Sequence, residues 1–200
     1  MIRVAVCFIW LFSVLSAPVW AADAPTAVVE KLHGALLQSM KGGAKMGFGG
    51  RKALLDPVVR EAYDLSAMAR VATGTAWAKL SDEEKAAVTE AFADWTVATY
   101  ASQFKSFDGE IFATKREVDA ARERKSVETT LTPKGEEPVV LNYQLRENGG
   151  AWKIIDVYLD GSVSQLAIRR NEFAGVLGKG GVPALIESMK ANAASLAKQG

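Results

Sequence analysis

Histidine and paired carboxylates are the side chains that could do acid–base chemistry in this chain. The 200 residues include one histidine, His33. An imidazole titrates near neutral pH, so it is a ready general base. However, no serine elbow or nearby cysteine completes a nucleophile–base arrangement with it. His33 lies beside the apolar stripe of a predicted helix, and this position favours a partly exposed helix residue over a catalytic one.

Asp156 and Asp160 are the second candidates, because two carboxylates can serve as acid and base when their environments differ. Four residues apart on one strand, they would share a face but lie ~13 Å from each other, too far to cooperate directly. Asp160 precedes Gly161 and is typical of a turn. Asp156 sits among apolar residues. We interpret it first as a structural carboxylate that faces Arg169 or Arg170, and second as a catalytic acid.

Neither a metal site nor a nucleotide site is supported, and we expect no cofactor. One histidine and one cysteine cannot form a typical zinc site. The glycine cluster at 47–50 lacks the spaced Gly-Lys-Ser/Thr that cradles phosphate. A second cluster at 178–181 fits a stop between two helices. Both clusters are interpreted as loops.

Residues 1–21 have the anatomy of a secretory signal peptide. Arg3 gives a positive start, Val4 to Leu15 is apolar, and small residues precede a cleavage site after Ala21. The apolar run is shorter than the ~20 residues of a spanning helix. Cys7 lies inside this segment, so residues 22–200 would form one domain without a thiol. Their charges balance, which gives no reason to expect nucleic acid as a partner.

The first half of the remaining chain has helical periodicity. Apolar residues recur at helical spacing over 27–40 and 51–63, and the glycine-rich segment 41–50 between them is predicted to be a flexible connection. Asp64 can cap a short helix that follows. Ser81-Asp82-Glu83-Glu84 then forms a capping box, the clearest helix start in the chain.

The helix behind this capping box carries Phe92 and Trp95 on one apolar face. The second half of the chain then changes to strand periodicity. The segment 139–146 alternates apolar and polar residues, and Asn148-Gly149 predicts a hairpin into 152–159. Further candidate strands are 125–132 and 111–116.

Two helices, around 163–177 and 183–197, are predicted to close the chain. The order of helices, strands and helices indicates an α+β fold: a curved antiparallel sheet of about four strands, packed with helices from both chain ends. The strand 152–159 is apolar on both faces and needs cover on each. More helix or a bound non-protein molecule could supply the second cover, and the residues alone do not choose between these.

Three motifs near the end of the chain resemble the MlaC family, also described as the toluene-tolerance or ABC-transporter auxiliary family. They are Trp152-Lys153-Ile154-Ile155-Asp156-Val157, then Gly161-Ser162-Val163-Ser164, then Arg169-Arg170-Asn171-Glu172-Phe173. The upstream order Met68-Ala69, Gly74, Trp77, Phe92 and Tyr100 is similar to the family's helical half. The version of these motifs in this chain is most similar to the hopanoid-biosynthesis-associated HpnM branch.

The resemblance implies a periplasmic carrier that moves a hopanoid or a phospholipid between inner- and outer-membrane complexes, without bond chemistry. It also implies an apolar cleft between sheet and helices, transient docking to membrane complexes, and a monomer. The residues expected to line this cleft are Phe92, Trp95, Val127, Val139, Leu141, Tyr143, Leu145, Ile155, Val157, Leu159, Ile168 and Phe173. Two alternatives stay open: an enzyme that uses Asp156 on a cone-shaped α+β scaffold, and a periplasmic interaction protein with a solid core.

Overall fold

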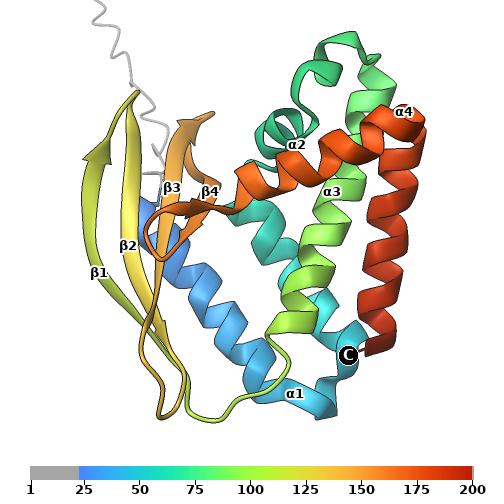
Figure 1. Ribbon diagram of the computed structural model, residues 1–200. Helices are drawn as coiled ribbons and strands as arrows, with labels where there is room; N and C mark the ends of the chain where they lie inside the picture. Colours follow the sequence, from blue (N-terminus) through green and yellow to red (C-terminus); the bar gives the residue numbers. More distant parts are fainter. Residues whose placement is uncertain (1–22, 200) are drawn as a thin grey trace, which may run out of the picture.

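The computed structural model describes residues 23–199, and in this part of the chain an antiparallel sheet carries helices on one side (Figure 1). The predicted export signal and Cys7 lie outside the described residues. The strands follow chain order across the sheet: β1 (Ile111–Ala120), β2 (Arg124–Thr132), β3 (Val139–Asn148), β4 (Ala151–Leu159) and the short β5 (Val163–Ser164). The predicted α+β class is confirmed, with β5 added to the expected strands.

The helices form a second layer against the sheet. They are α1 (Pro25–Ala62), α2 (Leu65–Thr73), the 3-10 helix η1 (Gly74–Lys79), α3 (Asp82–Gln103) and α4 (Gln165–Gln199). In Figure 1, α3 lies between α4 and the part of α1 that returns from the bottom of the molecule. Helices from both ends of the chain therefore meet at α3, as the sequence predicted.

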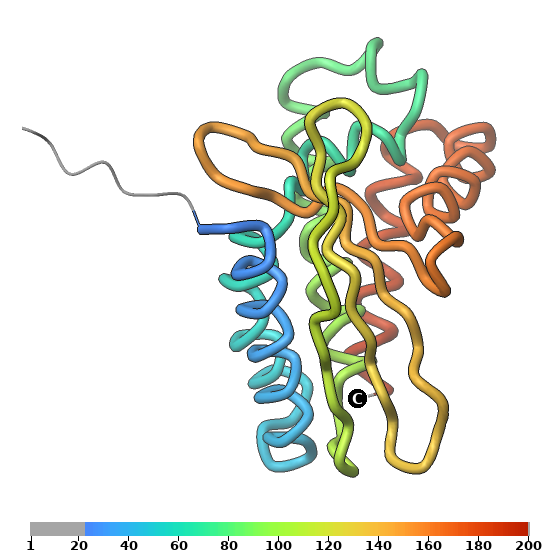
Figure 2. The backbone as a smooth tube through the Cα atoms, turned by 90° about the vertical axis from the view of Figure 1, so that its left-hand side faces the viewer, coloured from blue at the N-terminus to red at the C-terminus, as the bar shows by residue number. Residues whose placement is uncertain are grey.

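The segment 41–50, which the sequence predicted to be a flexible connection, is a compact reversal within α1. Gly43 and Gly47 have positive φ angles of 45° and 62°, which side chains rarely adopt. The two halves of α1 therefore run antiparallel and side by side (Figure 2). The buried Arg51 holds the reversal, because it donates to the carbonyl oxygens of Ala101 at 2.8 Å and Gly43 at 2.9 Å.

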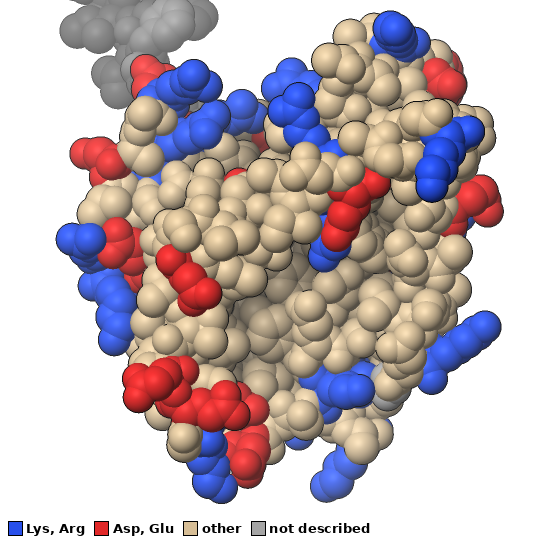
Figure 3. Space-filling view, in the orientation of Figure 1, with Lys and Arg blue, Asp and Glu red and all other residues tan. Residues whose placement is uncertain are grey.

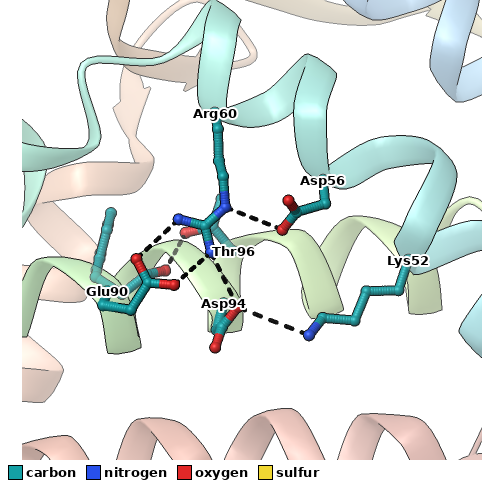
Figure 4. A network of polar contacts seen from close by, with 7 residues as sticks. Lys52, Asp56, Arg60, Glu90, Asp94 and Thr96 are labelled. Atoms are coloured by element: carbon teal, nitrogen blue, oxygen red, sulfur yellow. Dashed lines mark hydrogen bonds and ion pairs between the residues drawn. The ribbon is translucent and has the colours of Figure 1, made fainter.

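A surface network of charges joins the returning half of α1 to α3 (Figure 4). The guanidinium of Arg60 donates to Asp56 on its own helix and to Glu90 and Asp94 on α3, at 2.7–3.1 Å. Lys52 lies 3.7 Å from the same Asp94 carboxylate. A network of several charges fixes the position of two helices better than isolated surface ion pairs, which contribute little to the free energy of unfolding.

The predicted helix starts are confirmed in detail. The Asp64 carboxylate accepts from the amide of Ala67 at 3.0 Å and so caps α2. Ser81 and Glu84 exchange both bonds of a capping box at the start of α3. These caps satisfy amides that have no partner within the helix.

The two helices predicted at the end of the chain are one element with a sharp bend at Gly181, which has φ 65° and ψ −159°. Its first half crosses in front of the upper part of α3, and its second half runs alongside α3 (Figure 1). Gly149 and Gly150 likewise adopt positive φ angles in the turn between β3 and β4, where the sequence predicted a hairpin.

Candidate functional site

A cleft of about 220 Å³ lies between the inner face of the sheet and the helices α3 and α4. Figure 3 shows a hollow between the two layers, walled mainly by uncharged residues. The residues that line the cleft are Tyr63, Met68, Phe92, Trp95, Thr96, Thr99, Tyr100, Gln103, Phe104, Leu141, Tyr143, Asp156, Val157, Leu159, Gln165, Leu166 and Arg169.

The sheet wall of the cleft comes from two neighbouring strands. Leu141 on β3 is directly opposite Leu159 on β4, and Tyr143 is directly opposite Val157. Residues opposite each other in an antiparallel pair point to the same face. The sequence predicted all four at this wall, and all four line the cleft.

The helix wall is built around Trp95 on α3. Phe92 and Phe173 pack against its ring, with centroid distances of 6.3 Å and 5.7 Å. The guanidinium carbon of Arg169 lies 4.4 Å above the same ring, a cation–π geometry. Phe92 and Trp95 line the cleft, while the buried Phe173 supports them from behind.

The other five predicted residues lie outside the lining of this cleft. Val127 and Leu145 are fully buried in the core below the cleft. Val139 and Ile168 are each 37% exposed and are not among the lining residues. Ile155 is also absent from the cleft lining, because the strand register breaks at this residue.

A break in strand register displaces Ile155. Gln144 pairs with Asp156 but Leu145 pairs with Ile154, so Ile155 is an extra residue in β4 without an opposite partner. Such a bulge shifts the alternation of side chains by one position. Ile154, rather than Ile155, is therefore the buried residue beside Leu145.

The sequence analysis missed several lining residues. Tyr100 could have been found, because it lies eight positions after Phe92 and shares its helical face. Tyr63 and Met68 come from the joint between α1 and α2, far from β4 in sequence. A bridge between Tyr63 and Ile154 brings this joint to the sheet, and no local pattern announces that contact.

Asp156 is a structural carboxylate, although its partners are not the predicted arginines. Its oxygens accept from the amide of Val157 at 2.8 Å, the hydroxyl of Ser164 at 2.6 Å and the amide of Leu166 at 3.1 Å. Arg169 instead pairs with Glu172 at 2.7 Å. Asp156 thus ties the start of α4 to β4, which orients the helix that closes the cleft.

His33 is buried, in contrast to the predicted partial exposure. Its ring stacks on Phe112 at a centroid distance of 4.1 Å, and Nε2 lies 3.0 Å from the hydroxyl of Tyr143. Burial lowers the pKa of His33 to about 4, so the ring is neutral at physiological pH. His33 faces the back of a cleft residue and acts as a support for it.

Tyrosine hydroxyls form the floor of the cleft. The hydroxyls of Tyr63 and Tyr100 hydrogen-bond to each other, and that of Tyr143 bonds to His33. Burial raises the pKa of all three tyrosines above the usual value, so each hydroxyl keeps its proton. The floor is therefore polar but uncharged.

Two searches within residues 23–199 were negative. No group of three or more histidine, cysteine or acidic residues is placed to hold a metal ion. None of the described helices combines the length and the apolar character needed to cross a bilayer.

Comparison with known proteins identifies relatives of this chain. A family model described as "MlaC protein" matches residues 30–191. A phospholipid-binding protein from Ralstonia solanacearum, solved in complex with a phospholipid, is similar in structure, with a TM-score of 0.75 and 24% sequence identity. The match covers 88% of this chain and 99% of the other. A search of curated proteins finds no match.

Proposed function

This chain belongs to the MlaC family, and from that premise we propose that it is a periplasmic lipid carrier whose cargo lies in the cleft between sheet and helices. One observation carries the proposal: the cleft has apolar walls from β3, β4 and α3. An enzyme of the alternative kind would need a free acid, and Asp156 already accepts three hydrogen bonds.

The physical task of such a carrier is to hide hydrocarbon from water. Each exposed methylene costs ~0.8 kcal/mol, so a bare sixteen-carbon tail would cost on the order of 12 kcal/mol. Walls made mostly of apolar side chains can supply an equivalent apolar environment. They also permit release, because a membrane is just as apolar and the lipid gains little by staying.

The cargo is proposed to be a hopanoid or a phospholipid. The phospholipid bound to the Ralstonia solanacearum relative supports the second, and the similarity to the hopanoid-associated branch supports the first. The export pattern of residues 1–21 and the family membership support a periplasmic location. We further propose that the protein acts as a monomer and moves the lipid between membrane complexes.

Lipid transfer between two vesicle populations tests the proposal. Donor vesicles carry a fluorescent phospholipid or a labelled hopanoid, and acceptor vesicles carry none. We expect catalytic amounts of the protein to speed transfer of at least one of the two lipids. A transfer rate equal to that without protein, for both lipids, would contradict the carrier function.

A further inference from the structure

Three of the four tyrosines of the chain meet at the floor of the cleft. Tyr63 comes from the joint after α1, Tyr100 from α3 and Tyr143 from β3, so three separate elements deliver a phenol to one place. Tyr63 is 3% exposed and Tyr143 is 2% exposed. A solely apolar ligand would need no polar groups at this depth.

A count of hydrogens shows that one donor at this floor is unused. When the hydroxyls of Tyr63 and Tyr100 bond to each other, one of them donates and the other accepts. The accepting hydroxyl keeps its own hydrogen. Among residues 23–199, neither hydroxyl of the pair makes a second hydrogen bond.

Two threonines of α3 that line the cleft already use their hydroxyl hydrogens. The hydroxyls of Thr96 and Thr99 donate to carbonyl oxygens one turn earlier in α3, at 2.7 Å and 2.8 Å. Asp156 accepts three hydrogen bonds, and as a carboxylate it has no hydrogen to donate. The phenol pair keeps one unused hydrogen whichever hydroxyl donates, whereas Tyr143 keeps one only when His33 is the donor of their bond.

We propose that the Tyr63–Tyr100 pair is a recognition site for an oxygen atom of the cargo, either a hydroxyl or an ester carbonyl. This inference rests on the proposed carrier function and adds a selectivity to it. A water molecule can satisfy the phenol in the empty cleft. A ligand of pure hydrocarbon displaces that water without replacing its hydrogen bond, whereas an acceptor oxygen replaces it.

Two matched pairs of lipids test this site and separate the two sources of oxygen. The hydrocarbon hopanoid diploptene and its hydrate diplopterol differ by one hydroxyl group. A diacyl phosphatidylcholine and its diether analogue, with equal chains, differ by their ester carbonyls. The full mature chain is incubated with vesicles that contain both members of a pair, re-isolated, and extracted for mass spectrometry.

We expect the oxygen-bearing member of at least one pair to load roughly five- to tenfold more than its partner, the ratio of one ordinary hydrogen bond. The pair that shows this ratio identifies the source of the oxygen. Equal loading within both pairs overturns the inference while leaving the carrier function intact. Absence of loading for all four lipids overturns the carrier function itself.

The double variant Tyr63→Phe/Tyr100→Phe keeps both rings and removes both hydroxyls, so its loading ratio is expected to fall to about one. Each single variant retains one phenol hydrogen, so the double variant is the informative one. Tyr158→Phe is the matched control, because Tyr158 is outside the cleft lining. A double variant with the full ratio overturns the inference. If thermal melting shows that the double variant is unfolded, the loading ratio of the wild-type protein still tests the inference.

Discussion

His33 and Tyr143 form a buried pair that shapes the back of the cleft. His33 is 4% exposed, and its neutral ring accepts from or donates to the phenol according to its tautomer. The sequence placed His33 beside an apolar stripe but could not reveal its burial, because the covering residues Phe112 and Tyr143 come from strands far along the chain. The burial of His33 should make the stability of the protein depend on pH.

The stability of the protein should depend on pH through His33. Its folded-state pKa of about 4 lies below the unfolded value of about 6.5, so the unfolded chain binds the extra proton first. The free energy of unfolding should therefore fall as the pH drops through this window, by about 2 kcal/mol between pH 7 and pH 5. Denaturant unfolding at a series of pH values measures this slope.

His33→Gln provides the control for the pH dependence, since it retains a polar side chain but does not titrate. Its unfolding free energy should change less between pH 7 and pH 5 than that of the wild type. Identical slopes for the two proteins would show that His33 does not titrate as its burial requires.

Val157 gives a direct test of the sheet wall. Val157→Arg introduces a charge into an apolar cleft, where an unpaired ion is costly. We expect lipid loading from vesicles to fall roughly tenfold or more. Val140→Arg is the matched control, because Val140 on the same sheet is 38% exposed and outside the cleft. Normal loading by a folded Val157→Arg variant would refute this wall assignment.

At the scale of elements, local signals predicted most of the structure. Periodicity located the long strands and helices, and the capping residues Asp64 and Ser81 marked helix starts that the structure confirms. Two local irregularities were beyond such signals. The bulge at Ile155 depends on how β4 pairs with β3, and the reversal at 41–50 depends on the buried Arg51. The bulge is set by the pairing of β4 with β3, and the reversal is held by Arg51, which also bonds to Ala101 on α3.

The bend of α4 is an element-scale feature that one glycine permits. Gly181 has φ 65° and ψ −159°, a conformation essentially restricted to glycine, so Gly181→Ala should destabilise the protein by about 1–3 kcal/mol. Gly178 lies in the same helix with helical geometry and open space where a Cβ would go. Gly178→Ala should therefore stabilise by about 0.5–1 kcal/mol. Thermal or denaturant unfolding measures the stability of both variants against the wild type. If both substitutions changed the free energy of unfolding in the same direction, the role given to Gly181 in the bend would be contradicted.

At the scale of the whole molecule, the cleft depends on the meeting of the α1–α2 joint, α3, the sheet and the start of α4. No window of sequence contains this arrangement, which is why the lining was predicted only in part and through a family resemblance. The six predicted residues that line the cleft are on three elements with clear periodicity, α3, β3 and β4. Those that were missed or misplaced depend on register, burial or a joint between helices.

The volume of the cleft bears on how a cargo enters. About 220 Å³ is below the ~300–1,000 Å³ of typical ligand pockets. A lipid larger than this volume either extends out of the open cleft or displaces the helical wall from the sheet. The contacts that hold this wall are the packing of Phe173 on Trp95 and the tie from Asp156 to the start of α4.

Lipid bound to the protein from its native host would show whether the cleft carries a membrane lipid. The exported protein is purified without detergent, extracted with organic solvent, and its lipids are quantified by mass spectrometry. The account predicts a lipid in nearly equimolar amount, and its class would distinguish a hopanoid from a phospholipid. Protein that yields no lipid, even after incubation with vesicles made from the host's own membranes, would contradict the account.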